Sequence, residues 1–248
     1  MDVRLWSAPC APGVFLRRYV KEPDVSVANL AQQKQAGTAP KIWEIFHRPI
    51  VNVTALATLT AMGAQGGYYA VATWLPTFLK TDRGLTVVGS TGYLSFLIAG
   101  AFTGYLVGAW LADRIGRRTL FLVFSAGATA VVLAYTQLPI PNEIMLLLGF
   151  PLGFFASGYF SGMGPFLTEL FPTRLRGSGQ GFSYNFGRGV GALFPALVGY
   201  LSALMPLADA MALFAVLAYS VFLLAAYVPC QRRAEECCMP TPELQRAS

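Results

Sequence analysis

Six runs of predominantly apolar residues occupy most of the sequence after residue 49, and each is about 20 residues long or longer. They lie at residues 50–79, 87–111, 119–136, 144–168, 181–204 and 207–228. A bilayer core about 30 Å thick is crossed by about 20 helical residues, and lipid offers no partner for an open backbone. The sequence therefore predicts an all-α membrane protein with six transmembrane helices.

The composition supports a membrane protein over a soluble one. Of the 248 residues, 55% are hydrophobic and 12% are charged, whereas a soluble domain carries about 25% charged residues. The net charge of +6 would suit a nucleic-acid partner, but the basic residues lie between the apolar runs and not on one soluble face. We therefore expect the lipid bilayer, and no nucleic acid, as a partner.

The placement of lysine and arginine predicts the orientation of the helices. An even number of spans puts both termini on one side, and 15 of the 18 basic residues fall on that side. Lys80 and Arg83 fall on the other side, and Arg188 lies within a span. Basic loops stay in the cytoplasm, so we expect both termini there, with the chain in the plasma (bacterial inner) membrane. The predicted regions are a cytoplasmic segment and linker at 1–48, a six-helix domain at 49–229 and a cytoplasmic tail at 230–248.

Few residues offer catalytic or metal-binding chemistry. The cysteines predict neither a disulfide framework nor a metal site, because three share one tail and none has zinc-ligand spacing with a histidine; they are Cys10, Cys230, Cys237 and Cys238. The lone His47 lies before the first span, so no histidine reaches Ser178 as a serine protease would need. With no nucleotide-binding loop either, we expect no cofactor and no enzymatic activity.

Small residues repeat every four positions in the second and fourth spans. They are Gly100, Gly104 and Gly108 in one, and Gly149, Gly153, Ser157 and Ser161 in the other. Residues at this spacing share a helix face and let two membrane helices approach closely. We predict close packing at these faces, which would also let helices slide during a transport cycle, and kinks at Pro151, Pro165 and Pro195.

Two segments between spans carry a family resemblance. Residues 113–118, Asp-Arg-Ile-Gly-Arg-Arg, resemble the Asp-Arg-x-Gly-Arg-Arg signature of the major facilitator superfamily, which links helices two and three of each six-helix half. The usual glycine four residues before the aspartate is Ala109 here. Residues 169–179, Glu-Leu-Phe-Pro-Thr-Arg-Leu-Arg-Gly-Ser-Gly, resemble the segment between helices ten and eleven. The continuation to Arg188 is similar to the metabolite:proton symporters, in particular the sialate:proton branch, which also holds carriers of lactate and other carboxylates.

The resemblance covers about residues 17–230 and implies the carboxy-terminal half of a major-facilitator-type bundle. Residues 17–23 look like the stretch just after helix six, so helices one to six are expected to be missing, and residues 1–16 match no segment of the family. The resemblance implies secondary active transport, with proton-coupled uptake of a small organic anion such as a sialate or monocarboxylate by alternating access.

Charged residues of the two signature segments are predicted to form a conformational charge network. Its members are Asp113, Arg114, Arg117, Arg118, Glu169, Arg174 and Arg176. A pair between Glu169 and Arg114 or Arg117 would hold only while the cytoplasmic helix ends are close, and would stabilise one state of the cycle. Alternatively, these are surface charges that set the topology and contribute less than about 1 kcal/mol each.

Arg188 is the charged residue placed deepest in a predicted span. If the helix enters hydrocarbon near Phe182, Arg188 lies about 9 Å deeper, where a charge normally faces a water-filled cavity. Because a guanidinium matches a carboxylate, our hypothesis is that Arg188 binds the substrate carboxylate or steers anions. Alternatively, it extends back to the headgroups or pairs with a residue of the missing half.

Other polar side chains are candidates for lining the substrate path. In the first span they are Gln65, Tyr68 and Tyr69, with Trp74 nearby, and in the fifth span they are Tyr184 and Asn185. Hydrogen bonds between helices are the alternative role for them. Glu143 and Asp209 lie at external span ends and no carboxylate lies at mid-depth, so proton coupling would depend on the missing half.

Two classes of function remain open at this point. In one, the chain transports by joining a separate amino-terminal half or by pairing with itself, which a parallel-repeat architecture permits. In the other, it is a truncated, non-transporting fragment or an interaction partner of other membrane proteins.

Overall fold

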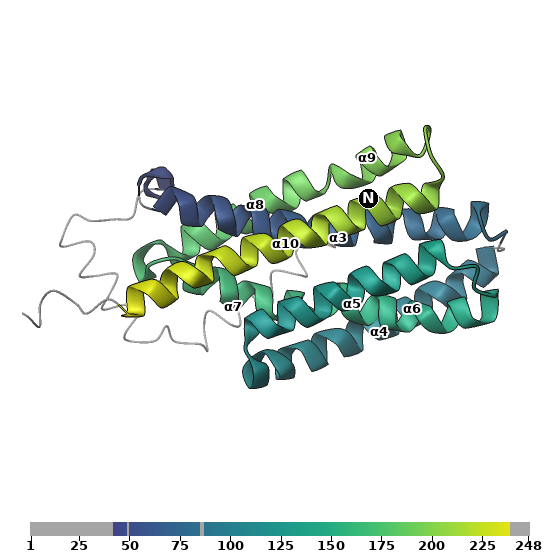
Figure 1. Ribbon diagram of the computed structural model, residues 1–248, viewed down its shortest axis with the longest axis horizontal. Helices are drawn as coiled ribbons and strands as arrows, with labels where there is room; N and C mark the ends of the chain where they lie inside the picture. Colours follow the sequence, from purple (N-terminus) through teal and green to yellow (C-terminus); the bar gives the residue numbers. More distant parts are fainter. Residues whose placement is uncertain (1–41, 49, 85–86, 239–248) are drawn as a thin grey trace, which may run out of the picture. The chain divides into compact units, whose positions relative to one another are not determined.

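The computed structural model describes residues 42–48, 50–84 and 87–238, and all regular structure in this part of the chain is helical (Figure 1). Its elements are η2 (Ile42–Phe46), α3 (Ile50–Thr81), α4 (Val87–Ile115), α5 (Arg117–Gln137), α6 (Asn142–Gly158), α7 (Phe160–Leu170), η3 (Thr173–Leu175), α8 (Arg176–Gly191), α9 (Phe194–Leu201) and α10 (Leu207–Cys238). The predicted all-α class is confirmed. The predicted cytoplasmic regions fall mostly on residues 1–41 and 239–248, outside the described residues, although α10 continues as helix to Cys238.

Every predicted span is helical, but two of them are interrupted. The fourth divides at Tyr159 into α6 and α7, and the fifth divides at residues 192–193 into α8 and α9. Pro195 lies in the first turn of α9, where a proline removes no internal hydrogen bond. Its predicted kink therefore appears as a helix start, whereas Pro151 and Pro165 lie inside α6 and α7.

Four segments of the described chain are long and apolar enough to cross a membrane. They are Gly92–Ile115, Arg117–Gln137, Ile144–Leu170 and Leu207–Tyr227. The first predicted span is not among them because threonine, glutamine and glycine interrupt the apolar residues of α3. The fifth is not among them because it divides into helices of 16 and 8 residues, the first of which is rich in glycine and polar residues. These two more polar helices pack against each other, and they carry most of the candidate binding residues.

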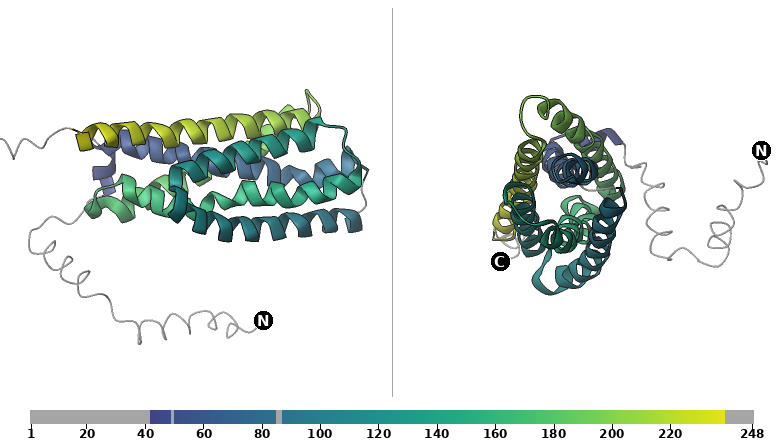
Figure 2. Two further views of the ribbon diagram at one scale, coloured as in Figure 1. Left: turned by 60° about the horizontal axis from the view of Figure 1, so that its bottom comes forward. Right: turned by 90° about the vertical axis from the view of Figure 1, so that its right-hand side faces the viewer.

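Helix α3 lies between α8 and α10, and α4 packs along α6 (Figures 1 and 2). Helix α5 contacts both α6 and α10 and so connects the two groups. The start of α3, the α4–α5 turn and the end of α7 lie at one end of the helices, which we call the basic end (Figure 1). The α3–α4 and α5–α6 connections lie at the opposite end. From the distribution of lysine and arginine, we expect the basic end to be cytoplasmic.

The glycine faces of α4 and α6 pack directly on each other, as predicted. A Cβ atom on Gly100 would lie 2.0 Å from the carbonyl oxygen of Phe150, and one on Gly104 would lie 2.4 Å from that of Phe154. From the other side, a Cβ atom on Gly153 would lie 2.0 Å from a carbonyl oxygen of α4. Because backbone meets backbone at these positions, no larger side chain fits without moving one helix.

At the opposite end, side chains tie the connections together. Arg83 donates hydrogen bonds to the carbonyl oxygens of Leu138, at 3.1 Å, and Ile140, at 3.3 Å. The Nε2 atom of Gln137 donates to a carboxylate oxygen of Asp209 in the first turn of α10, at 2.9 Å. Arg83 thereby joins the α3–α4 connection to the α5–α6 connection. Gln137 joins the end of α5 to the start of α10.

Candidate functional site

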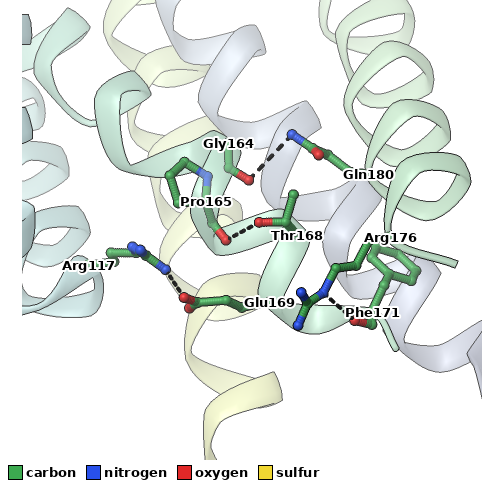
Figure 3. Close-up of polar contacts among 8 residues, drawn as sticks. All are labelled: Arg117, Gly164, Pro165, Thr168, Glu169, Phe171, Arg176 and Gln180. Atoms are coloured by element: carbon green, nitrogen blue, oxygen red, sulfur yellow. Dashed lines mark hydrogen bonds and ion pairs between the residues drawn. The ribbon is translucent and has the colours of Figure 1, made fainter. Parts of the chain in front are cut away.

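A single residue, Gly116, joins α4 to α5 at the basic end. Its φ of +82° is a left-handed conformation that side chains disfavour, which explains the glycine in this signature. The next residue, Arg117, forms an ion pair with Glu169 near the end of α7 (Figure 3). Arg114, the other partner considered from the sequence, instead lies over the ring of Trp110 at 5.0 Å. The tight turn therefore selects Arg117 as the partner of Glu169.

The other charges of the predicted network lie in three different surroundings. Asp113 and Arg118 line a pocket of about 520 Å³ together with Arg117 and Glu169. Arg174 lies apart and forms an ion pair with Glu44 of η2. The Nε atom of Arg176 donates to the carbonyl oxygen of Phe171 at 3.4 Å (Figure 3).

Helices α7 and α8 are joined next to the ion pair by polar contacts to backbone. The Nε2 atom of Gln180 in α8 donates to the carbonyl oxygen of Gly164 in α7 at 3.4 Å (Figure 3). Within α7, the hydroxyl of Thr168 donates to the carbonyl oxygen of Pro165 at 2.7 Å. The Gln180 contact joins the helix that carries Glu169 to the helix that leads to Arg188, and the Thr168 contact is internal to α7.

We expect the Arg117–Glu169 pair to modulate the transport cycle modestly. The two side chains are 28% and 52% exposed, and exposed pairs contribute about 0.2–1 kcal/mol. Glu169→Gln should therefore change the uptake rate by less than about fivefold. The reversed pair, Arg117→Glu with Glu169→Arg, should recover what each reversal alone loses, measured as a double-mutant cycle on uptake. Labelling of a cysteine placed at Thr119 reports how accessible the basic end is. If Glu169→Gln changes neither uptake nor this labelling, Arg117 and Glu169 are surface charges without a role in the transport cycle.

Arg188 of α8 reaches the middle of α3. Its Nε atom donates a hydrogen bond to the hydroxyl oxygen of Tyr69 at 2.9 Å. Arg188 lies about 18 Å along α8 from Arg176, and Tyr69 lies about 18 Å before the α3 end at Thr81. The guanidinium is thus directed to a phenol that is far from both ends of α3. The side chain therefore does not extend back to the basic end.

Glycines of α8 bring this arginine close to α3. A Cβ atom on Gly187 would lie 2.6 Å from Cβ of Ala61, and one on Gly191 would lie 3.1 Å from Cβ of Gln65. Both glycines are buried, whereas the side chain of Arg188, which lies between them in the sequence, is exposed. The glycines therefore form the contact with α3, and Arg188 lies at its edge.

The remaining candidates of the first span differ in their surroundings. Gln65 is buried, with 4% of its surface exposed. Tyr68 packs against Tyr69, with ring centroids 5.9 Å apart, and edge-on against Phe160 of α7 at 5.7 Å. Trp74 donates a hydrogen bond to the carbonyl oxygen of Pro195 at 2.8 Å, which is the helix-to-helix role considered as its alternative.

The two candidates that precede Arg188 do not join it in a polar contact. The Nδ2 atom of Asn185 donates to the carbonyl oxygen of Gly181 in its own helix at 2.8 Å. Tyr184 is half-buried and packs against the apolar core. Tyr69 is thus the predicted residue that the structure brings to the guanidinium.

Three aromatic residues near this site escaped the sequence reasoning. The hydroxyl of Tyr159, at the α6–α7 break, donates to the carbonyl oxygen of Ala64 at 2.9 Å. Phe160 stacks on Tyr105 of α4, with centroids 6.4 Å apart, and so connects α4 to Tyr68. Aromatic residues inside apolar runs resemble ordinary core residues in a sequence, and only the structure shows that Tyr159 and Phe160 contact α3 while Tyr105 contacts Phe160.

Comparison with known proteins identifies the family and several relatives of this chain. A family model described as Major Facilitator Superfamily matches residues 5–195 and 93–242. The "Probable 4-methylmuconolactone transporter" of Cupriavidus pinatubonensis is 39% identical over 221 residues, which cover 88% of this chain and 50% of that protein. The cis,cis-muconate transport protein of Acinetobacter baylyi is 32% identical over 211 residues, covering 78% and 48%. The sialic acid transporter NanX of Escherichia coli is 26% identical over 159 residues, covering 64% and 39%.

These matches confirm the family suggested by the two signature segments. All three relatives are named as transport proteins, in agreement with the prediction that this chain is not an enzyme. The chain spans about half the length of the curated relatives it matches. The apolar helical architecture, the two signature segments at the basic end and the family match lead to one assignment: the chain belongs to the Major Facilitator Superfamily.

Proposed function

We propose that this chain forms the carboxy-terminal six-helix part of a secondary transporter that carries small organic anions across the membrane. The observation that carries the proposal is the position of Arg188, which is exposed in the last turn of α8 and hydrogen-bonded to Tyr69 in the interior of α3. The relatives named for transport of muconate and sialic acid support the substrate class, because both compounds are carboxylic acids. We propose that Arg188 binds the carboxylate of the substrate.

The chemistry of the pair suits this role. Tyr69 engages the Nε atom of Arg188, and among the described residues no further hydrogen bond or ion pair involves this guanidinium. The two terminal nitrogens can then bind a carboxylate with two parallel hydrogen bonds. Tyr69 would hold the guanidinium in place, and Tyr68, Phe160 and Tyr105 would provide an aromatic wall for the rest of the solute.

The exposed face of α4 supports a second six-helix unit as partner. In the most apolar stretch of Gly92–Ile115 only 17% of the residues are buried, against 50% in that of Leu207–Tyr227. Large apolar side chains are exposed along one stripe of α4 at every fourth residue: Ile98, Phe102, Leu106 and Trp110. We propose that this stripe and the exposed face of α8 pack against the second unit, either a separate amino-terminal half or a second copy.

Such an arrangement would support alternating access, in which two units rock around a site between them. The ion pair at the basic end would then contribute to the state in which that end is closed. Asp113, Glu169 and Asp209 lie near the ends of α4, α7 and α10, and among the described residues none of them forms an ion pair with Arg188. We propose that the acidic residue needed for proton coupling belongs to the second unit.

Uptake in cells tests this function. We expect cells that express this chain with the unmatched half of the 4-methylmuconolactone transporter to accumulate labelled muconate, sialate or lactate above the vector control. An uncoupler that collapses the proton gradient should abolish the accumulation. Uptake by the chain alone would indicate pairing with itself. A chain that inserts stably in the membrane and transports none of these anions in either setting would favour the alternative, a non-transporting fragment or interaction partner.

A further inference from the structure

An apolar groove of about 220 Å³ lies between α5 and α10. Its wall is formed by Phe121 and Leu122 of α5 and by Leu223, Leu224 and Tyr227 of α10, and Arg118 is its charged lining residue. Leu122 and Leu224 are 58% and 69% exposed. The groove is therefore open on the outside of the helices.

The groove has a direction relative to the helix ends. Arg118 is the second residue of α5, at the basic end, and Phe121 and Leu122 lie about one turn, or 5 Å, further along the helix. Helix α10 runs toward the basic end (Figure 1), so its Tyr227 lies nearer that end than Leu223 and Leu224. Arg118 and Tyr227 thus lie nearer the basic end than the leucines that follow Arg118 in α5 and precede Tyr227 in α10.

Arg118 differs from its neighbours because it has no polar partner among residues 42–48, 50–84 and 87–238. Among the described residues, Arg117 pairs with Glu169, Arg174 pairs with Glu44 and Arg114 lies on Trp110. No hydrogen bond or ion pair in this part of the chain involves the exposed guanidinium of Arg118. The first turn of α5 also lacks a side-chain cap, so its free N–H groups add positive potential at the same place.

We propose that this groove binds one anionic phospholipid, with an acyl chain along the leucines and the phosphate at Arg118. The apolar floor excludes a free phosphate or a soluble anion as the main occupant, because neither would fill it. The charge at its headgroup end complements a lipid phosphate, and basic pockets between helices on the cytoplasmic side suit anionic headgroups. Since Arg118 also lines the pocket of the Arg117–Glu169 pair, the phosphate would lie beside that pair.

Lipid retention by the purified chain tests the proposal without measuring transport. The chain is equilibrated with equal amounts of phosphatidylglycerol and phosphatidylcholine in detergent, and bound lipid is counted by native mass spectrometry. We expect one retained phosphatidylglycerol in excess over phosphatidylcholine. Arg118→Gln should lower its retention by about fivefold, the factor that corresponds to about 1 kcal/mol for a basic residue at an anionic surface. Leu122→Trp, which fills the groove, should lower retention of the same lipid while leaving the charge in place.

Arg114→Gln is the matched control, because it removes a charge from the same turn outside the groove. Arg118→Lys keeps the charge and should retain the lipid, so it separates loss of binding from loss of folding. Equal retention of the two lipids, or equal loss in Arg114→Gln and Arg118→Gln, would overturn the proposal. So would a lipid-independent dimer cross-linked through cysteines at Leu122 and Leu224, because a second copy would then cover the groove.

Discussion

Replacing Arg188 by glutamine is expected to lower carboxylate uptake by the paired transporter by about 30-fold or more. Loss of one partner of a desolvated, hydrogen-bonded charge pair costs about 2–5 kcal/mol, and 2 kcal/mol corresponds to about 30-fold. Glutamine keeps a hydrogen-bond donor but removes the charge and the fork that match a carboxylate. Initial uptake rates at several substrate concentrations, with transporter amounts equalised by immunoblot, measure the effect.

Two further variants separate substrate binding from packing at this site. Tyr69→Phe leaves the aromatic ring but removes the hydroxyl that accepts from Arg188. We expect it to weaken uptake about tenfold, because a hydrogen bond to a charged group contributes about 1.5–3 kcal/mol. Tyr200→Phe is the control, since this tyrosine is exposed on α9, and it should leave uptake unchanged. Arg188→Gln with a normal apparent affinity for an anionic substrate would contradict the proposed role.

Replacing Gly100 by alanine is expected to destabilise the chain by about 3 kcal/mol, at the upper end of typical overpacking costs. The new methyl group would lie 2.0 Å from the carbonyl oxygen of Phe150, and a backbone carbonyl cannot rotate away as a side chain can. Helices α4 and α6 must therefore separate along the face where they pack. The free energy of unfolding, followed by circular dichroism during titration of detergent micelles with sodium dodecyl sulfate, measures the loss.

Gly92→Ala provides the matched control on the same helix. The nearest atom to its new methyl group is Cδ1 of Leu146 at 3.9 Å, an ordinary contact distance. We expect the stability of this variant to stay within about 0.5 kcal/mol of the parent. If both variants unfold alike, the close approach of α4 to α6 does not contribute to stability.

Much of the candidate site was predictable because the relevant signals are local. Charged residues in a loop and glycines four positions apart are visible in any sequence, and their helix faces follow from the helical repeat. The partner of Arg174 was not predictable, because Glu44 precedes the first span and becomes its neighbour only when η2 packs against α8. The divided fifth span was also missed, since hydropathy does not distinguish a continuous helix from two helices joined at residues 192–193.

The sequence by itself determined the all-α membrane class and the family, and the orientation expected from its basic residues stays a prediction. These properties depend on composition, on the spacing of apolar residues and on short motifs, and each of these can be recognised within one helix or one loop. Only the tertiary structure decided which of the six apolar runs pack together, that Arg117 and not Arg114 pairs with Glu169, and that Arg188 meets Tyr69. The six runs predicted from hydropathy are all helical, yet α3 and α8 are the less apolar of them and pack on each other. The reason is that helices in lipid associate through close backbone packing, and the position of each glycine decides which side chains that packing brings together.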